Sequence, residues 1–284
     1  LSTSFFNVNS NSGNLLADEY SLYISDCIFT QNKASVNGGA IAISIIEEQP
    51  PNNIEIRGCT FIGNEASDDD QDDAENGGAI YYEFSSTPKY AKGETCFKIF
   101  DCKFTSNKVS FFGGAICIIF KNGAQPTGII QIEQCVFDNN QATNSNSQGE
   151  QNGYGGDIYY SFETSSSSKD FSITKCNFSN SFSTLGGSIY TLINTESSEQ
   201  ATISIGDCSF KDINKNNKEI DAINFITKNP SVNYKVSKCD FQGHSSILFN
   251  AISGTIENCV FTNIVAPAIR YDCNYDGEQE IQES

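Results

Sequence analysis

Short segments in which apolar and polar residues alternate recur along the chain, and each ends shortly before a cysteine. In the first segment, Leu22 and Ile24 lie five and three residues before Cys27. The later apolar pairs at this spacing are Ile54 and Ile56, Phe97 and Ile99, Ile130 and Ile132, Phe171 and Ile173, Ile203 and Ile205, and Tyr234 and Val236. Alternation with a period of two predicts a β-strand with one buried face. The pattern therefore predicts an all-β protein.

Each cysteine and the phenylalanine two residues after it form a second inward pair, whose parity is shifted by one residue. In a straight strand this shift would turn the second pair outward, so the chain must bend just before the cysteine. Asp26, Gly58 and Asp101 occupy that position, and aspartate and glycine are favoured in turns. We therefore predict a corner between two strands at this point of every repeat.

A second corner is predicted at the asparagine five residues after the cysteine, as at Asn32. Its short amide side chain tolerates left-handed backbone and can hydrogen-bond to its copies above and below. A glycine pair then permits a close approach or a positive φ before a third strand. In that strand Ile41, Ile43 and Ile45 are expected to point inward. Three short strands and three corners would make one coil.

The unit Cys-x-Phe-x-x-Asn, followed by Gly-Gly-Ala-Ile, is complete at Cys27, Cys59 and Cys102, and weaker copies begin at Ser4, Cys135, Cys176, Cys208, Cys239 and Cys259, which makes nine repeats in all. The shortest repeat, from Cys239 to Cys259, spans 20 residues, which is enough for one turn of a parallel β-helix. A unit that cannot bury its apolar face alone must stack on its neighbours. We therefore predict a single-stranded right-handed parallel β-helix, a pectin-lyase-like solenoid of about nine coils over residues 1–271. An acidic polar tail would follow over residues 272–284.

Like residues of successive coils are expected to form columns inside this solenoid. The predicted core ladder consists of Cys27, Cys59, Cys102, Cys135, Cys176, Cys208, Cys239 and Cys259, and of Phe29, Phe61, Phe104, Phe137, Phe178, Phe210, Phe241 and Phe261. Because a buried thiol behaves as a small hydrophobic group, we expect the ladder cysteines to be reduced. Stacked Cα atoms about 4.8 Å apart fall within disulfide range, so vertical disulfides are the alternative.

The two longest insertions, residues 65–76 and 141–154, fall between the ladder asparagine and the glycine pair, two coils apart. Insertions on one corner of a solenoid commonly mark its binding surface. The first contains candidate calcium ligands, namely Asp68, Asp70, Asp72 and Asp73. These carboxylates lack the spacing of an EF-hand, so we favour solvated charge over a metal site.

Tyrosines occupy the outward position of the third strand at Tyr81, Tyr159 and Tyr190. A stripe of tyrosines on an exposed sheet could stack with sugar rings or anchor a protein partner. The alternative is the ordinary preference of tyrosine for strands. These three residues are the binding candidates in the sequence.

Composition excludes several classes of function. The formal net charge is −18 and there are only two arginines, so no phosphate-binding surface and no nucleic-acid partner are expected. No apolar run is long enough for a membrane helix, so no membrane insertion by this segment is expected. The chain contains no methionine, which suggests a processed portion of a longer product.

Parallel β-helices also include polysaccharide lyases and hydrolases, whose catalytic residues leave recognisable signals in a sequence. His244 is the only histidine, and its Gly-His-Ser context lacks the companion motifs of polygalacturonases. A serine or cysteine nucleophile would also need a base, and the ladder cysteines point inward. We therefore expect no enzyme and no cofactor, with a polysaccharide-processing enzyme as a minor alternative.

The segment 29–32 with its glycine pair at 38–39, and the segments 61–64 and 104–107 with theirs, resemble the polymorphic outer membrane protein repeat. That repeat combines Phe-x-x-Asn with Gly-Gly-Ala-(Ile/Leu/Val) and is known from chlamydial surface autotransporters and large protist surface proteins. The resemblance implies a β-helical passenger displayed outside the cell and used in adhesion. The regular cysteine two residues before the phenylalanine is more stringent than the family motif.

Together these features favour a non-catalytic protein at the cell surface or in the extracellular space. We expect a rigid adhesion or display module that binds a glycan or a protein on another surface. The alternative is a structural subunit of a larger filament, coat or surface assembly, whose partners would be neighbouring subunits.

Overall fold

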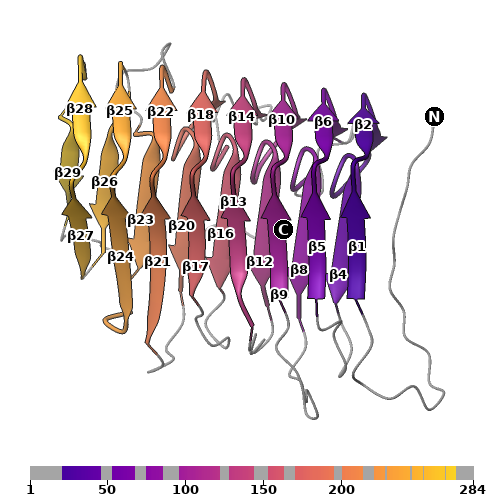
Figure 1. Cartoon of the computed structure of the whole chain (residues 1–284), viewed down its shortest axis with the longest axis horizontal. Coiled ribbons are helices and arrows are strands. Elements are labelled where there is room, and N and C mark those ends of the chain that lie inside the picture. The colour runs from indigo at the N-terminus through magenta and orange to yellow at the C-terminus, as the bar shows by residue number, and fades with distance from the viewer. Residues whose placement is uncertain are drawn as a thin grey trace, which may run out of the picture.

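The computed structural model describes most of the chain between Ser21 and Asp272. The described ranges are 21–45, 53–67, 75–85, 96–121, 128–143, 153–162, 170–194, 200–213, 221–227, 229–243, 245–251, 253–265 and 267–272. Within these ranges all regular elements are β-strands, and none is a helix. The strands lie side by side along one long axis, from β1 at one end to β27, β28 and β29 at the other (Figure 1).

The strands form four parallel sheets, which we name A to D. Sheet A contains β1 (Ser21–Ser25), β5 (Asn53–Arg57), β9 (Cys96–Phe100), β13 (Ile130–Glu133), β17 (Phe171–Thr174), β21 (Ala201–Gly206), β24 (Val232–Ser237) and β27 (Gly254–Glu257). Sheet B contains β2 (Ile28–Thr30), β6 (Thr60–Ile62), β10 (Lys103–Thr105), β14 (Val136–Asp138), β18 (Asn177–Ser179), β22 (Ser209–Lys211), β25 (Asp240–Gln242) and β28 (Val260–Thr262). Sheet C contains β3 (Lys33–Ala34), β7 (Glu65–Ala66), β11 (Lys108–Val109), β15 (Gln141–Ala142) and β19 (Phe182–Ser183). Sheet D contains β4 (Ile41–Ile45), β8 (Ile80–Phe84), β12 (Ile116–Phe120), β16 (Ile158–Phe162), β20 (Ile189–Ile193), β23 (Ile223–Thr227), β26 (Ile247–Asn250) and β29 (Ile269–Tyr271).

Each of the first five described coils visits the sheets in the order A, B, C and D, whereas the last three have strands in sheets A, B and D only. The chain then rises by one strand to begin the next coil. Pairing is parallel and places like residues opposite each other, so that Phe104 is the partner of both Phe61 and Phe137. The predicted parallel β-helix is therefore confirmed, with eight coils in the described residues. The weak repeat that begins at Ser4 lies outside the described residues, because residues 1–20 are not described. Residues 273–284, nearly all of the predicted acidic tail, also lie outside them.

Sheet C corrects the predicted coil of three strands. Its strands are two residues long and lie where a loop was expected between the asparagine and the glycine pair. Ala66, Val109 and Ala142 from three of these strands pack into a small apolar cluster of their own. Two residues are too few to display a period of two, so alternation could not reveal this sheet.

The first corner has left-handed backbone at the predicted position, with φ of 55° at Asp26 and 51° at Asp101. At the second corner the left-handed residue is the one before the asparagine, with φ of 53° at Gln31 and 56° at Ser106. The prediction of left-handed backbone at Asn32 itself was therefore one residue off. The asparagine side chain points into the coil instead, because the preceding residue makes the turn.

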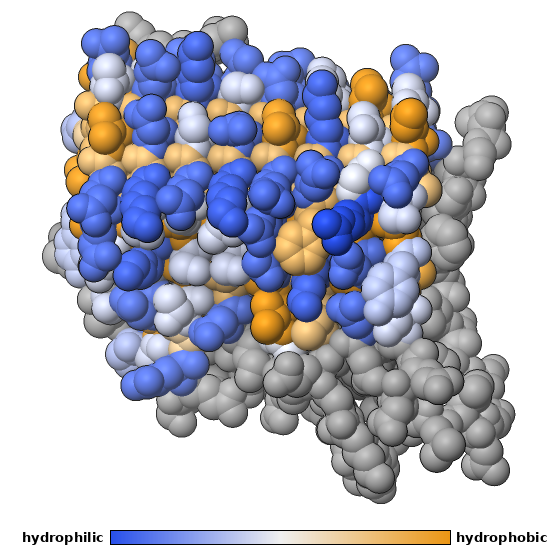
Figure 2. Space-filling view, in the orientation of Figure 1, coloured by the Kyte–Doolittle hydropathy of each residue, from blue (hydrophilic) through white to orange (hydrophobic). Residues whose placement is uncertain are grey.

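The interior is one apolar core built of stacked columns. In the phenylalanine column, the ring centroids of Phe61 and Phe104 are 4.8 Å apart and their planes differ by 2°. The buried ladder members are Cys59, Cys102, Cys135, Cys176, Cys208, Cys239, Phe61, Phe104, Phe137, Phe178, Phe210 and Phe241. At the two ends, Phe29, Phe261 and Cys259 are partly buried and Cys27 is exposed. The outer face of sheets A and B is mostly hydrophilic, with apolar side chains scattered over it (Figure 2).

The second glycine of the first four pairs is required by close contact between coils. A Cβ atom on Gly114 would lie 2.1 Å from the carbonyl oxygen of Gly156 and 2.6 Å from the backbone nitrogen of Gln141. These neighbours are backbone atoms of adjacent strands, so they cannot yield without separating two coils.

We therefore expect Gly114→Ala to lower the free energy of unfolding by about 3 kcal/mol, the upper part of the usual range for overpacking. Gly206→Ala is the matched control, because its added Cβ would lie 3.5 Å from the Ser237 hydroxyl oxygen, an ordinary contact. Urea denaturation of both variants measures the difference. Equal stability of the two variants would contradict the close approach at Gly114.

Candidate functional site

The outward face of sheet D is covered, which corrects the predicted exposed tyrosine stripe. Tyr81, Tyr159 and Tyr190 are only 3%, 3% and 6% exposed. They do point away from the main core, but they belong to a second apolar cluster outside it. The other buried members of this cluster are Cys117, Ile119 and Ile226. The rings of Tyr159 and Tyr190 stack at 5.7 Å, with planes 5° apart.

Part of this cover comes from the residue directly before the glycine pair. Phe112, Tyr154 and Leu185 are half-buried and pack against the second cluster. The ring of Phe112 lies 4.4 Å from that of Tyr159, and the ring of Tyr154 lies 5.1 Å from that of Tyr190. An apolar residue immediately before Gly-Gly is a signal in the sequence that could have predicted this cover. These half-buried side chains lie closer to solvent than the tyrosines beneath them.

A polar edge borders the second cluster on β8. The hydroxyl of Tyr81 donates a hydrogen bond to the carboxylate of Glu83. Lys121, one residue after β12, places its Nζ atom 4.0 Å from the same carboxylate. The phenol of Tyr81 is therefore held by its own strand, which leaves its ring face for packing.

Both long insertions leave sheet C and return before sheet D, at the corner that the sequence predicted. Their bounds are narrower than predicted, because Glu65–Ala66 is β7 and Gln141–Ala142 is β15. The returning residues are ordered parts of the coil, since Asn76 and Tyr154 form β-bridges to neighbouring coils. The carboxylates proposed as weak calcium candidates, Asp68, Asp70, Asp72 and Asp73, lie outside the described residues.

A ladder of asparagine amides runs beneath this corner. The Nδ2 atom of Asn32 donates to Oδ1 of Asn64 at 2.8 Å, Asn64 to Asn107 at 2.9 Å, and Asn107 to Asn140 at 3.0 Å. All but the first of these asparagines are fully buried. The predicted hydrogen bonds between asparagine copies are therefore confirmed.

The ladder ends at a buried carboxyl group, that of Asp157. In the next coil a serine, Ser181, replaces the asparagine, so Asn140 Nδ2 donates to Oδ1 of Asp157 at 2.8 Å instead. The hydroxyl of Ser181 donates to the same oxygen at 2.7 Å. Burial raises the pKa of Asp157 to about 7, against the opposing effect of the hydrogen bonds from Ser181 and Asn140. This carboxyl group can therefore hold a proton near neutral pH.

A second buried carboxylate, Asp221, is paired rather than isolated. It accepts a hydrogen bond from the Ser246 hydroxyl at 2.7 Å and forms an ion pair with Arg270 of β29. Arg270 is one of the two arginines of the chain, and it ties the eighth coil to the sixth, because Asp221 lies just before β23 and Arg270 lies in β29. The pair is structural, because Asp221 is only 2% exposed.

The described residues contain no group of three or more histidine, cysteine, aspartate or glutamate side chains that could hold a metal ion. His244 lies outside the described residues. No helix in the described part of the chain is long and apolar enough to cross a membrane.

The fold is a parallel β-helix in which successive coils repeat one sequence motif, Phe-x-x-Asn at the second corner followed by a glycine pair. The model of the Chlamydia polymorphic membrane protein repeat family matches residues 26–44 and 58–83 of the chain. These segments run from the first corner into sheet D of the first two coils, so the predicted resemblance is confirmed there. Members of this family are surface-exposed outer membrane proteins, and the two matched segments cover 45 of the 284 residues of this chain. Neither the curated proteins nor the solved structures gave a match to the chain.

Proposed function

We propose that this chain is a non-catalytic surface module, a stiff β-helical shaft that presents one corner to a protein or glycan on another surface. The observation that carries the proposal is the departure of both long insertions from the same corner, after β7 and β15. Surface insertions positioned by a rigid scaffold are a common way to build a binding site.

The stiffness of the shaft supports a display role. Sheets A, B and D continue in register through all eight described coils, sheet C continues through the first five, and a column of phenylalanine rings runs through the core. Asparagine amides form a second column in the first four coils. A solenoid of this kind holds features of one coil at a fixed place relative to the next. Two insertions on one corner can therefore meet a single partner together.

The charge of the chain limits the partner. A formal net charge of −18 repels polyanions such as nucleic acid or acidic glycans. A neutral glycan or a protein with a basic surface fits the corner better, because the 68–74 insertion contains five aspartates. The proposed partner is therefore a neutral glycan or a protein with a basic surface.

The buried carboxyl groups support the non-catalytic part of the proposal. Asp157 is 0% exposed and Asp221 is 2% exposed, so neither reaches a substrate. Glycoside hydrolysis needs two carboxyl groups that flank a bound sugar. A Cys-type nucleophile would need an accessible thiolate with a base, and the inner ladder cysteines are buried.

We expect replacement of residues 68–74 by Gly-Ser to reduce binding to the target surface severalfold without a loss of stability. Long surface loops contribute little to folding, so the free energy of unfolding should change by about 0.5 kcal/mol or less. Binding of purified chain to cells or to an immobilised glycan panel measures the first effect, and urea denaturation the second.

A companion variant replaces residues 144–152 in the same way; it removes the other insertion of the corner, whose only acidic residue is Glu150, and keeps the five aspartates. Full binding by a variant that carries both replacements would reject the insertion corner as the binding surface. Collapse of the fold in either deletion would reject the assignment of that segment as an insertion.

A second function, a structural subunit of a larger assembly, is favoured by the two ends of the shaft. Among the described residues, Ile28 is 76% exposed and Tyr23 65% exposed at one end, and Val260 is 57% and Tyr271 61% exposed at the other. Open strand edges can pair with those of another copy, and head-to-tail contacts generate filaments. Sedimentation over a range of concentrations distinguishes the two functions, because only a subunit forms end-to-end polymers that Ile28→Lys abolishes.

A further inference from the structure

A column of cysteine thiols runs through the shaft beside the phenylalanine column. Every described cysteine is a free thiol, and six of the eight ladder members are buried. The column passes through all eight described coils, from the exposed Cys27 to the partly buried Cys259. None of the functions proposed above uses these thiols.

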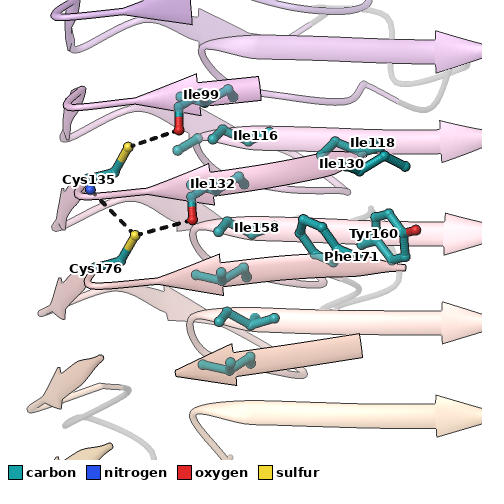
Figure 3. Close-up of a cluster of buried hydrophobic side chains, with 14 of the residues drawn as sticks. Ile99, Ile116, Ile118, Ile130, Ile132, Cys135, Ile158, Tyr160, Phe171 and Cys176 are labelled. Carbon is teal, nitrogen blue, oxygen red and sulfur yellow. Dashed lines mark hydrogen bonds between the residues drawn. The ribbon is translucent and has the colours of Figure 1, made fainter. Parts of the chain in front are cut away.

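The sulfurs repeat with the spacing of the coils. The backbone N–H of Cys135 donates to the Sγ atom of Cys176 at 3.4 Å, and the Cys27–Cys59, Cys59–Cys102 and Cys176–Cys208 steps have the same distance (Figure 3). Each ladder thiol also donates to the carbonyl oxygen two residues before it, at 3.3 Å for both Cys135 and Cys176. Identical contacts in successive coils mean identical side-chain conformations. Adjacent sulfurs therefore lie about 4.8 Å apart, the spacing between neighbouring strands.

This spacing suits a two-coordinate metal ion. The midpoint between two such sulfurs lies roughly 2.4 Å from each, close to the typical metal–thiolate bond of about 2.3 Å. Thiolates select soft ions such as Cu(I), and a closed-shell monovalent ion accepts two ligands in a line. A disulfide requires Cβ atoms about 3.8 Å apart, so it would need two coils to move together. The column is better matched to a bridging ion than to a covalent bond.

We propose that the cysteine column binds soft monovalent metal ions of the Cu(I) class, each held between the sulfurs of two successive coils. Each thiol that becomes a ligand loses one proton to solvent and forms a sulfur–metal bond, without any change of oxidation state. In a filled column an interior thiolate is shared by two ions, so positive and negative charges nearly cancel within the apolar core.

The surroundings of the sulfurs support thiolate ligands. Each backbone N–H that points at a sulfur stabilises negative charge on it, as hydrogen bonds around a metal site commonly do. Burial raises the pKa of the Cys176 thiol well above its ordinary value. Metal binding must therefore displace protons, and affinity should rise with pH. Only the two sulfurs of neighbouring coils would hold each ion, so each proposed site is two-coordinate.

The test uses two variants that each lose three ladder cysteines. Cys102→Ser with Cys176→Ser and Cys239→Ser leaves only one adjacent pair of thiols, Cys27 and Cys59. The second variant combines Cys27→Ser, Cys239→Ser and Cys259→Ser, and it keeps an unbroken run from Cys59 to Cys208 with four adjacent pairs. Cysteines outside the column are the same in both variants. Stoichiometry is measured by native mass spectrometry after anaerobic titration with Cu(I) in the presence of bicinchoninate as competitor.

We expect the unbroken variant to bind roughly four times as many ions as the interrupted one, with thiolate-to-copper absorption in the ultraviolet. Equal binding by the two variants, or no binding by the natural chain, would overturn the proposal. If serine prevents folding, X-ray absorption of the copper-loaded natural chain decides. Two sulfur neighbours in a line support the column, whereas nitrogen or oxygen neighbours overturn it.

Discussion

Truncation of Phe104 to alanine is expected to lower the free energy of unfolding by about 3 to 5 kcal/mol. Phe104 is 0% exposed, and its ring stacks on Phe61 at 4.8 Å and on Phe137 at 4.9 Å. Removing the ring would take away both stacking contacts and leave a cavity between three coils. Because both neighbours are held by their own strands, the cavity cannot close without bending the shaft. Urea denaturation followed by circular dichroism measures the loss.

Phe261→Ala is the matched control, since it removes the same side chain at the end of the same column. Phe261 is partly buried and stacks on Phe241 at 4.8 Å. Its truncation should cost about 1 to 2 kcal/mol, in proportion to the smaller apolar area it buries. A loss below about 1 kcal/mol for Phe104→Ala would remove this residue from the interior column. The slope of the denaturation curve must be compared as well, because a weakened solenoid can unfold in parts.

The coil and its columns were predictable because their signals are local. The inward residues of sheet A alternate over five residues, as at Leu22 and Ile24, and the Cys-x-Phe spacing fixes the change of direction that follows. The corner at Asp26 follows from the one-residue shift between the inward positions before it and those after it. Sheet C carried no such signal, because a strand of two residues has no period.

The outer face of sheet D could be predicted only in part. Alternation correctly placed Tyr81, Tyr159 and Tyr190 on the face opposite the core, but it cannot tell whether that face meets water. Their cover depends on contacts from another part of the coil, such as that of Phe112 with Tyr159. Those contacts follow from the turn at the glycine pair, which positions the preceding side chain over the sheet.

The buried acid escaped prediction because it depends on two substitutions in different coils. Asp157 stands where the first three described coils have alanine, and Ser181 stands where the first four have asparagine. Neither substitution alone indicates a site. Only the stacking of coils shows that the carboxylate of Asp157 accepts the hydrogen bond from Asn140 that the missing amide would have accepted.

We expect Asp157 to make the shaft more stable in mild acid than at neutral pH. Its pKa is raised from 3.8 to about 7 by burial, so the folded chain holds a proton that the unfolded chain releases. The stabilisation is therefore fully present below about pH 4 and is lost progressively as the pH rises to about 7. Over this range the contribution changes by roughly 4 kcal/mol.

Asp157→Asn isolates this contribution, because asparagine does not titrate and its Oδ1 atom can still accept from Asn140 and Ser181. The stability of Asp157→Asn relative to the natural chain should increase between pH 5 and pH 8 by roughly 2 to 4 kcal/mol. Asp240→Asn, at an exposed position of β25, controls for the loss of one negative charge. Urea denaturation at the two pH values measures all three chains. A stability difference that is the same at pH 5 and pH 8 would mean that Asp157 is ionised in the folded shaft throughout. The carboxylate would then be stabilised by its two hydrogen bonds more strongly than burial opposes its charge.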